Sequence, residues 1–238
     1  CLPRRSGGTV GQTAGLAMTR FNLLVGGPQA LYPSHWQRLP GDWVGVDRGT
    51  LHLLEAGIAP AFAVGDFDSL TEVEHQRVGQ QVAEIHAKSD MDETDTDMAV
   101  RLAFGEHHAT EVCLVGATGG RIDHFLSNLF MPTQPQFAAY TNHITMLDAE
   151  NNIRFYHPGH YQLEALFGYH YLGIVPLTAV SHLEIQDAKY PLHDWSSQTP
   201  FSWASNEFLA GQPTQISWTA GIVAVIQSRD RRGQKLNN

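Results

Sequence analysis

The chain of 238 residues contains almost no cysteine and little lysine. Cysteine occurs only at Cys1 and Cys113, which excludes a disulfide framework and predicts a reducing, cytoplasmic location. No uninterrupted apolar run approaches the roughly 20 residues that a membrane helix needs. A basic stripe with interleaved aromatic residues is also missing, which argues against nucleic-acid binding.

Several common binding and catalytic motifs are absent as well. The sequence has neither GxxxxGK[ST] nor GxGxxG, which argues against a P-loop NTPase and a dinucleotide-dependent oxidoreductase. Its 13 histidines are scattered, without HExxH or Cys/His zinc spacing. Pairs such as His107–His108 and His157/His160 are therefore interpreted as surface residues rather than metal ligands.

The first 17 residues are small and polar, lack an apolar signal core and precede Met18. We expect residues 1–17 to be a vector-derived or disordered tail and exclude them from fold reasoning.

From Phe21 to about Leu147, short apolar runs alternate with helical patterns. Buried strands are predicted at residues 21–27, 43–47, 61–66 and 111–117. Helices are predicted between them, around residues 50–56, 70–79, 94–105 and 121–131. Strands that alternate with helices predict a Rossmann-like parallel sheet with flanking helices.

The second part of the chain is rich in aromatic residues, and its pattern differs. Residues 149–238 contain 12 of the 23 aromatic side chains, in short apolar runs separated by Gly, Pro, Asn and Asp. This pattern predicts an antiparallel β-sandwich. The fold class is therefore expected to be α/β plus all-β, with domains at residues 18–148 and 149–238.

Acidic residues are concentrated in one segment. The formal charge is −9, and residues 66–97 hold ten acidic residues against Arg77 and Lys88. A solvated acidic face is the ordinary interpretation of such a run. A divalent-cation site is the alternative, because hard cations prefer carboxylate oxygens.

The stretch VGDFDSL (64–70) places two carboxylates where a buried strand is predicted to end. On extended backbone, Asp66 and Asp68 would point to one side and Phe67 to the other, towards the body of the domain. That arrangement suits two oxygen ligands on one cation. A turn that caps a helix is the structural alternative.

A second acidic stretch, KSDMDETDTD (88–97), opens a predicted helix. Asp92 or Thr94 could cap that helix, and acids in a first turn suit the helix dipole. Asp95 shares a helix face with Ala99 and Leu102, so its carboxylate is predicted to face inward. An inward carboxylate needs a partner, and a metal ion would serve.

The stretch GATGGRIDH (116–124) lies between a predicted strand and a helix start. Backbone N–H groups at Gly119 and Gly120 could hold phosphate oxygens, and Arg121 could contact the same anion. His124 and Asn128 share a helix face. Because ligands bind at the carboxyl ends of parallel strands, this loop, Asp47 and Asp66 are expected at one sheet edge. The combination indicates a nucleoside triphosphate with magnesium.

These motifs together resemble the thiamine pyrophosphokinase family. The matching segments in the first half are DRG (47–49), GIAP (57–60), GDFDS (65–69), Lys88 with DETD (92–95), and GATGGRIDH with Asn128. Those in the second half are KYPL (189–192), SNEF (205–208) and GIVAVIQS (221–228). One departure is Asp187-Ala188, where the family usually has glycine and leucine before the Lys-Tyr pair.

The resemblance implies a homodimer with its active site at the subunit interface, an ATP- and magnesium-binding α/β domain, and a thiamine-binding sandwich. It implies that the metal and pyrophosphate site is formed by Asp47, Asp66, Asp68, Asp92 and Asp95. It assigns to the nucleotide and active-site loop the residues Gly119, Gly120, Arg121, Asp123 and His124, with Lys88 and Asn128 as further nucleotide contacts. Ser205 and Asn206 would face thiamine, and Tyr190 and Trp203 are candidates for stacking on its cationic ring.

The expected reaction is transfer of a pyrophosphoryl unit from ATP to the thiamine hydroxyl, which releases AMP. One aspartate, with Asp92 as the first candidate, would accept the hydroxyl proton. Two other functions compete with this hypothesis. One is a metal-dependent phosphohydrolase acting on a nucleotide or sugar phosphate, and the other is a nucleotide-sensing module whose sandwich binds a protein.

Overall fold

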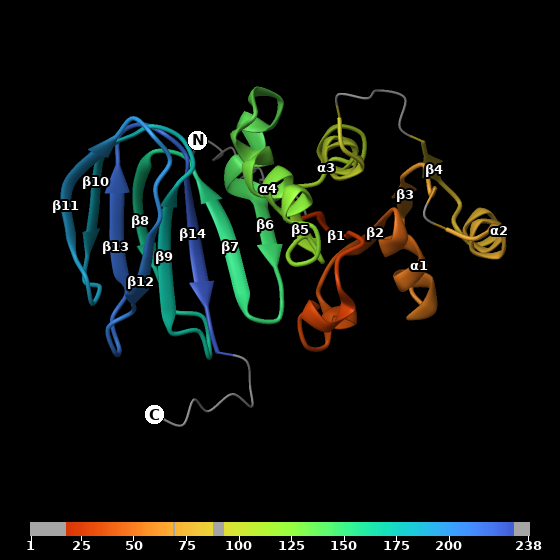
Figure 1. The fold of residues 1–238 in the computed structure, drawn as a ribbon, viewed down its shortest axis with the longest axis horizontal. Helices are drawn as coiled ribbons and strands as arrows, with labels where there is room; N and C mark the ends of the chain where they lie inside the picture. The colour runs from red at the N-terminus through yellow and green to blue at the C-terminus, as the bar shows by residue number, and fades with distance from the viewer. Residues whose placement is uncertain (1–17, 69, 88–92, 231–238) are drawn as a thin grey trace, which may run out of the picture.

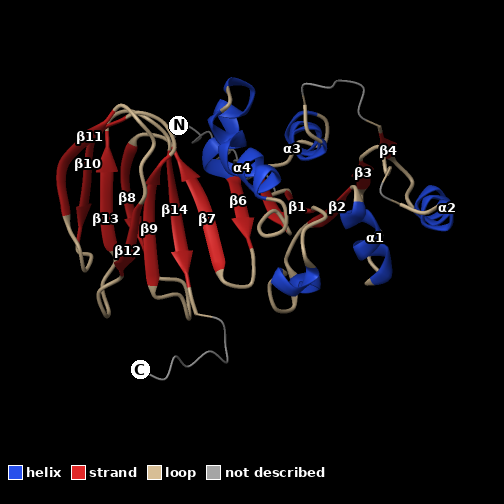
Figure 2. Cartoon of the chain, in the orientation of Figure 1, coloured by secondary structure: helices blue, strands red, loops and turns tan. Residues whose placement is uncertain are grey.

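The structure is a computed structural model that describes residues 18–68, 70–87 and 93–230 (Figure 1). It contains a sheet of ten strands in the order β12-β9-β14-β7-β6-β5-β1-β2-β3-β4, and a second sheet in the order β11-β10-β13-β8. Helices gather at one end of the molecule and the four-stranded sheet lies at the other (Figure 2). The predicted fold class, α/β plus an antiparallel sandwich, is confirmed. The expected tail, residues 1–17, lies outside the described residues.

Neighbouring strands at one end of the long sheet run parallel. They are β1 (Arg20–Leu24), β2 (Asp42–Val46), β3 (Phe62–Val64), β4 (Ile85–His86), β5 (Glu111–Val115) and β6 (Ile144–Leu147). The sequence predicts four of them correctly, because β1, β2, β3 and β5 are almost wholly buried and read as continuous apolar runs. It misses β4, a two-residue edge strand without such a run, and β6, which is only four residues long.

Four α-helices connect these strands. They are α1 (Arg48–Glu55), α2 (Glu72–Gln81), α3 (Asp95–Gly105) and α4 (Ile122–Phe130). Short 3-10 helices are η1 (Gln29–Leu31), η2 (Trp36–Arg38), η3 (Met131–Thr133) and η4 (Pro135–His143). Each predicted helix is confirmed within two residues at its ends. The starts of α2 and α3 are defined by capping boxes, in which a threonine side chain and an acid three residues later satisfy each other's backbone N–H groups.

Helices cover both faces of the parallel strands. Val44 and Val46 of β2 belong to the core cluster that contains Leu102 of α3. Trp43 points to the other face, where it shares a cluster with Leu53 of α1. The alternation along β2 therefore places α3 and α1 on opposite sides of the sheet, as Figure 1 shows.

The β-rich half forms the predicted sandwich. Its strands are β7 (Asn151–Tyr156), β8 (Gly159–Leu163), β9 (Tyr171–Pro176), β10 (Val180–Gln186), β11 (Leu192–Ser197), β12 (Trp203–Glu207), β13 (Thr214–Trp218) and β14 (Val223–Ser228). Side chains from both sheets share one core, for example Ile174 and Val225 from the long sheet with Leu183 and Ile216 from the short one. All pairings within this half are antiparallel.

The long sheet continues across the expected domain boundary. Strand β6 pairs in parallel with β5 and in antiparallel with β7, so backbone hydrogen bonds run from one half to the other without a gap. The turn between β6 and β7 is held by Asp148, whose Oδ1 accepts from the N–H groups of Glu150 and Asn151, each at 2.7 Å. A division into two domains at residue 148 remains a prediction. The secondary structure does change at this turn, from alternating strands and helices to strands alone.

Within the described part of the chain, no helix combines the length and the apolar character needed to cross a membrane.

Close contact between α1 and β1 gives a prediction about stability. A Cβ added at Gly49 would lie 1.8 Å from the carbonyl oxygen of Leu24, which is backbone and cannot rotate away. We expect Gly49→Ala to lower the free energy of unfolding by about 2 kcal/mol or more, measured by urea denaturation.

The matched control is Gly79→Ala in the exposed part of α2, where an added Cβ meets nothing within 4 Å. Alanine should stabilise that helix by about 0.5–1 kcal/mol, because it removes the entropic cost of glycine. Equal effects of the two substitutions would contradict the packing described for α1.

Candidate functional site

The carboxyl ends of four neighbouring strands form the candidate site. In the order β5-β1-β2-β3, these strands are followed by Gly116, Val25, Asp47 and Gly65. All four run parallel, so their ends lie at one edge of the sheet. The convergence expected from the sequence is therefore present for the loops that follow β2, β3 and β5.

Glycines let the loops after β5, β1 and β2 approach one another. A Cβ at Gly27 would lie 2.1 Å from the carbonyl oxygen of Gly116, and one at Gly116 would lie 2.5 Å from the oxygen of Val25. On the other side, a Cβ at Gly26 would lie 3.3 Å from Cβ of Arg48. Only residues without a side chain fit at Gly27 and Gly116, so the loops make direct backbone contact.

Asp47 and the loop after β3 are also in direct contact. The Asp47 N–H donates to the carbonyl oxygen of Val64 at 2.9 Å. A Cβ at Gly65 would lie only 2.2 Å from Oδ1 of Asp47, so this carboxylate lies directly beside the residue that precedes Asp66. Asp47 itself has φ 47° and ψ −126°, a conformation that costs a non-glycine residue about 1–3 kcal/mol. Such local strain is typical of residues retained for their chemistry.

The GDFDS segment has a different geometry from the one predicted. Phe67 has φ 59°, in the left-handed region, so the extended-backbone argument that put Asp66 and Asp68 on one side is wrong. Instead, Oδ1 of Asp66 accepts a hydrogen bond from the Asp68 N–H at 3.1 Å, which makes a tight turn. Phe67 is buried in a cluster with Val78 and Val82, so its predicted direction, towards the body of the domain, is confirmed.

The start of α3 buries carboxylate oxygens that have no hydrogen-bond partner among the described residues. Thr94 caps the helix, with Oγ1 accepting from the Asp97 N–H at 3.0 Å and the Thr94 N–H donating to Oδ2 of Asp97. Oδ1 of Asp95 and Oδ1 of Asp97 are both buried, and neither accepts a hydrogen bond from the part of the chain that the structure describes. Burial raises the pKa of Asp97 above the usual range of an aspartate. A buried, unsatisfied carboxylate oxygen is costly, and a cation would offset that cost.

These acids fit a divalent cation by their chemistry. Carboxylate oxygens that could bind a cation are available at Asp47, Asp66, Asp68 and Asp95. Of these, Oδ1 of Asp95 is buried and accepts no hydrogen bond from the described residues. In the described part of the chain, however, no three of these four residues bring their ligand atoms within 4.8 Å of one another. Two further predicted contributors, Lys88 and Asp92, lie outside the described residues.

The glycine loop contains two glycines with positive φ, followed by two exposed charged side chains. Gly119 and Gly120 have φ values of 75° and 68°, and a Cβ at Gly119 would lie 2.3 Å from Cδ1 of Leu31. Arg121 follows, and its guanidinium donates two hydrogen bonds to the carboxylate of Asp123. This contact holds the pKa of Asp123 below its usual value. Since both side chains are exposed, an incoming anion can compete for Arg121.

The remaining residues of the loop lie at the start of α4. His124 is exposed in its first turn, and Asn128 is buried one turn later. The Asn128 amide donates to the carbonyl oxygen of Ala117 at 3.3 Å, which ties the helix to the loop. Thr118 donates its hydroxyl proton to Oδ2 of Asp148 at 2.6 Å, in a fully buried contact.

Asp148 was missed by the sequence analysis. Its two oxygens connect the glycine loop to the turn between β6 and β7, so Asp148 holds the glycine loop in position. The available signal was weak, because an aspartate between an apolar strand and the sequence AENN is also typical of a simple turn.

In the sandwich, a β-bulge re-aims the residues expected near thiamine. The register of β12 against β9 shifts between Trp203 and Asn206, and Ser205 within this bulge is exposed with φ 63°. Asn206 is buried, and its amide accepts from the Tyr190 N–H at 2.9 Å and donates to the Tyr190 carbonyl at 2.8 Å. Asn206 therefore fixes the segment that carries Tyr190.

Tyr190 is 56% exposed, so it does not belong to the core of the sandwich. Its neighbour Lys189 contacts Glu207 at 2.6 Å and lies over the Tyr190 ring at 5.4 Å from the centroid. The departure at Asp187 has a structural explanation: its φ of 58° is a conformation that glycine adopts easily and aspartate tolerates.

Trp203, the second stacking candidate, belongs to an aromatic cluster and packs partly buried against the core of the sandwich. Its ring lies 5.3 Å from that of Trp195 and 4.9 Å from that of Phe201. Nε1 of Trp203 is buried and has no hydrogen-bond partner among the described residues. A group that accepts a hydrogen bond could therefore be recognised at this position.

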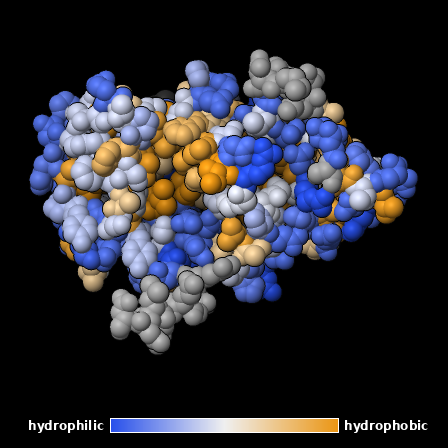
Figure 3. Space-filling view, in the orientation of Figure 1, coloured by the Kyte–Doolittle hydropathy of each residue, from blue (hydrophilic) through white to orange (hydrophobic). Residues whose placement is uncertain are grey.

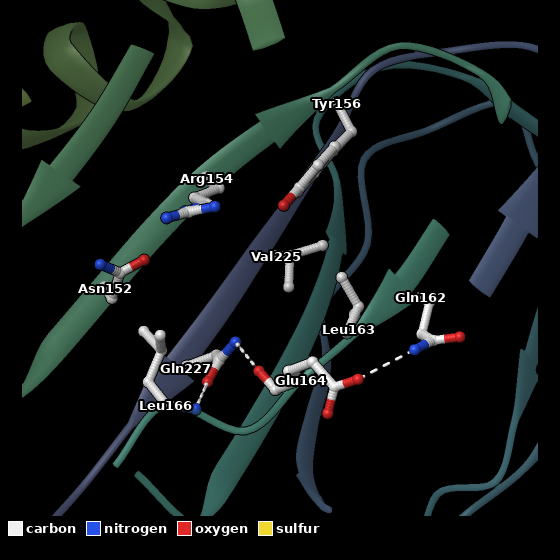
Figure 4. A pocket seen from close by; sticks show the side chains of 9 residues that line it. All are labelled: Asn152, Arg154, Tyr156, Gln162, Leu163, Glu164, Leu166, Val225 and Gln227. Carbon is white, nitrogen blue, oxygen red and sulfur yellow. Dashed lines mark hydrogen bonds between the residues drawn. The ribbon is translucent and has the colours of Figure 1, made fainter. Parts of the chain in front are cut away.

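A pocket of about 230 Å³ lies elsewhere in the β-rich half (Figure 4). Asn152, Arg154 and Tyr156 of β7 line one side of it. Gln227 of β14 bridges the segment after β8, donating to the carbonyl of Glu164 and accepting from the Leu166 N–H. None of the predicted site residues lines this pocket, so it is distinct from the edge where the acids and the glycine loop meet.

Comparisons with known proteins agree with this arrangement. Residues 36–144 match the family model of the thiamin pyrophosphokinase catalytic domain, and residues 160–223 match that of the thiamin pyrophosphokinase vitamin B1 binding domain. The chain is 34% identical over 223 residues to the thiamine pyrophosphokinase of Bacillus subtilis (strain 168), covering 90% of this chain and 100% of that protein.

Solved structures show the same similarity. A protein from Lactobacillus plantarum is 45% identical, and a thiamin pyrophosphokinase family protein from Enterococcus faecalis is 38% identical. Each superimposes with a TM-score of 0.83 and covers 90% of this chain and 100% of its own. The order of the two matched domains, their coverage and these identities show that the chain belongs to the thiamin pyrophosphokinase family.

Proposed function

We propose that the protein transfers a pyrophosphoryl group from ATP to the hydroxyl of thiamine, giving thiamine pyrophosphate and AMP. The observation that carries this proposal is that the glycine loop and the residues after β2 and β3 lie along one edge of the sheet, in a chain of this family. Glycine N–H groups there suit phosphate oxygens, and the neighbouring carboxylates suit a metal that would accompany them.

Phosphate binding is assigned to the loop after β5. Gly119 and Gly120 would present backbone N–H groups to the polyphosphate, and Arg121 would exchange its exposed contact with Asp123 for a phosphate oxygen. His124 would approach the same group from the first turn of α4, while Asn128 holds the loop in place. Lys88 would add positive charge to the nucleotide site.

Magnesium is the metal that this donor set would hold. Its ligands would come from Asp47, Asp66, Asp68, Asp92 and Asp95, all of which offer hard carboxylate oxygens. When bound, Mg²⁺ would offset the negative charge that the phosphates bring to this acidic region. The buried Oδ1 of Asp95 would gain the partner that it lacks among the described residues.

The reaction requires alignment and one proton acceptor. The thiamine hydroxyl oxygen forms a bond to the β-phosphorus of ATP, and the bond from that phosphorus to the oxygen bridging to the α-phosphate breaks, so AMP leaves. The hydroxyl proton passes to an aspartate carboxylate, for which Asp92 is the first candidate and Asp95 the second. Positioning of the two reactants then supplies much of the rate enhancement.

Thiamine binding is assigned to the sandwich residues around the β12 bulge. Ser205 is exposed there, and Asn206 holds the backbone of Tyr190. The exposed ring of Tyr190 and the cluster around Trp203 offer aromatic faces to a cationic ring.

A homodimer with its active site at the subunit interface is part of the proposal. Helix α4 exposes Ile122, Leu126 and Phe130 by 73%, 43% and 37%, at a spacing that aligns them along one side of the helix. Figure 3 shows apolar side chains gathered in the middle of the molecule, near α4 and β7 as Figure 1 places them. An apolar patch of this kind is typical of a protein interface. The second copy would cover it close to the glycine loop.

A cytoplasmic location is proposed as well. Cys113 is a buried free thiol whose pKa is raised by burial, so it is protected from oxidation and suited to a reducing compartment.

The products formed from ATP and thiamine test the proposed activity. Phosphorus NMR should show thiamine pyrophosphate and AMP accumulating in equal amounts, and only when thiamine is present. ADP with free phosphate would identify a phosphohydrolase and refute the proposal. Tight ATP binding without thiamine-dependent AMP release would also refute it.

Removal of a carboxylate charge tests the metal assignment. Asp66→Asn and Asp95→Asn should each lower turnover roughly 100-fold or more without lowering the unfolding midpoint, because the charge that holds the metal is lost. The control is Asp42→Asn, at the exposed amino end of β2 on the opposite edge of the sheet, which should leave turnover unchanged. A variant that keeps half of the wild-type activity at low magnesium would remove its residue from the metal site.

A charge in the apolar patch tests the dimer. Leu126→Arg should shift the mass measured by light scattering after size exclusion from two chains to one, and turnover should fall with it. Val73→Arg is the control, because Val73 is 76% exposed but lies on α2, at the far end of the sheet from β7. A Leu126→Arg protein that stays dimeric would contradict the assignment of this surface.

A further inference from the structure

Two histidines and a glutamate meet on the α3 side of the sheet, outside the residues assigned to catalysis. Glu84 directly precedes β4, His86 lies within β4, and His107 follows α3. Their ligand atoms all lie within 4.8 Å of one another. Oε1 of Glu84 is 2.6 Å from Nε2 of His86 and 3.2 Å from Nε2 of His107.

The expectation that His107 is a surface residue is wrong. Its side chain is 23% exposed, and its ring stacks on Phe62 with centroids 4.2 Å apart and an interplanar angle of 8°. His86 meets the same Phe62 ring edge-on at 5.9 Å. Phe62 is fully buried, so its contacts with both imidazole rings hold them in place. The orientation of the two Nε2 atoms is therefore set by the protein itself.

The cluster is only partly hydrogen-bonded. Nε2 of His86 and Oε1 of Glu84 share a hydrogen bond at 2.6 Å. Nε2 of His107 is buried and makes no well-formed hydrogen bond among the described residues, although it lies 3.2 Å from Oε1 of Glu84. Buried polar atoms nearly always have a partner, so this nitrogen indicates a missing one. A metal ion would bind this nitrogen and the Glu84 carboxylate together.

The donor set selects the class of ion. Two imidazole nitrogens with one carboxylate suit Zn²⁺, whereas Mg²⁺ prefers oxygen ligands alone. Tetrahedral zinc with ligands at about 2.0–2.1 Å separates neighbouring ligand atoms by roughly 3.4 Å. The distances of 2.6 and 3.2 Å in this cluster need to open by less than 1 Å to reach that value.

We propose that Glu84, His86 and His107 form a zinc-binding site with three protein ligands and a fourth position open to solvent. The Glu84 side chain is 44% exposed, which leaves a path for the ion and for a water or small anion beside it. The proposal does not depend on the proposed transferase activity, because none of the three residues belongs to the site at the carboxyl edge.

Zinc binding would fasten an otherwise weak part of the sheet. Strand β4 has two residues and lies at the sheet edge, yet the His86 carbonyl accepts from the Gly65 N–H at 3.1 Å, directly before Asp66. A metal that joins β4 to the end of α3 would hold this edge in place. The expected consequence is a higher unfolding temperature. The ion binds the folded state, in which the three ligands lie together, more tightly than the unfolded chain, in which they do not.

Cobalt and zinc titrations test the site on the full chain without an affinity tag. Saturating Mg²⁺ is kept present so that carboxylate-only sites are filled. One equivalent of Co²⁺ per chain should bind and show the intense visible absorption of a tetrahedral site. Added Zn²⁺ should displace the bound Co²⁺ and remove that absorption. The unfolding temperature should rise with added Zn²⁺.

Single substitutions decide whether these three residues are the ligands. Glu84→Gln, His86→Gln and His107→Gln should each lose that equivalent and the thermal shift, with affinity falling by more than the roughly 10–100-fold that second-shell changes cost. The matched control is His143→Gln, because His143 also contacts a glutamate, Glu111, at 3.1 Å but has no third ligand nearby among the described residues.

The outcomes separate cleanly. Loss of one equivalent in the cluster variants, with His143→Gln behaving as wild type, supports the site. Glu84→Gln changes an exposed side chain, so this variant still tests the site if a histidine variant fails to fold. Equal stoichiometry, spectrum and thermal shift in wild type and Glu84→Gln would overturn the proposal, whatever the result of the thiamine assay.

Discussion

Backbone contact at the carboxyl ends of the parallel strands is the constraint on which the rest of the site depends. Gly27 against Gly116, and Gly65 against Asp47, leave no space for a side chain at either glycine. The first contact joins residues 89 positions apart in sequence, and the second joins residues 18 apart. Acidic side chains, the glycine loop and the exposed guanidinium of Arg121 therefore lie along one edge of the sheet, where ligands of such folds bind.

Stability and chemistry are in tension at this edge. Asp47 adopts a strained backbone conformation, and Asp95 and Asp97 each bury an Oδ1 that has no hydrogen bond within the described residues. Each feature costs free energy in the folded protein without ligand. The capping box of Thr94 and the buried contact between Thr118 and Asp148 hold the surrounding backbone in place despite that cost. Negative charge is thereby concentrated where a cation can relieve it.

The fold and most of the edge could be predicted from the sequence because periodicity and strand order are local signals. The four buried strands, the four helices and the loops that follow Val46, Val64 and Val115 were all visible as patterns. Side-chain contacts between remote segments were not. The left-handed Phe67, the buried tie made by Asp148 and the approach of His107 to Glu84 depend on tertiary packing, for which one sequence carries no spacing rule.

Strand β6 limits how the protein can move. Since β6 is hydrogen-bonded to β5 on one side and to β7 on the other, the parallel half and the sandwich share an unbroken ladder. A hinge between them would have to rupture that ladder, so capture of substrates by swinging two lobes together is not open to this architecture. Access and enclosure fall instead to the loops at the strand ends, whose rearrangements are smaller and faster than those of whole domains.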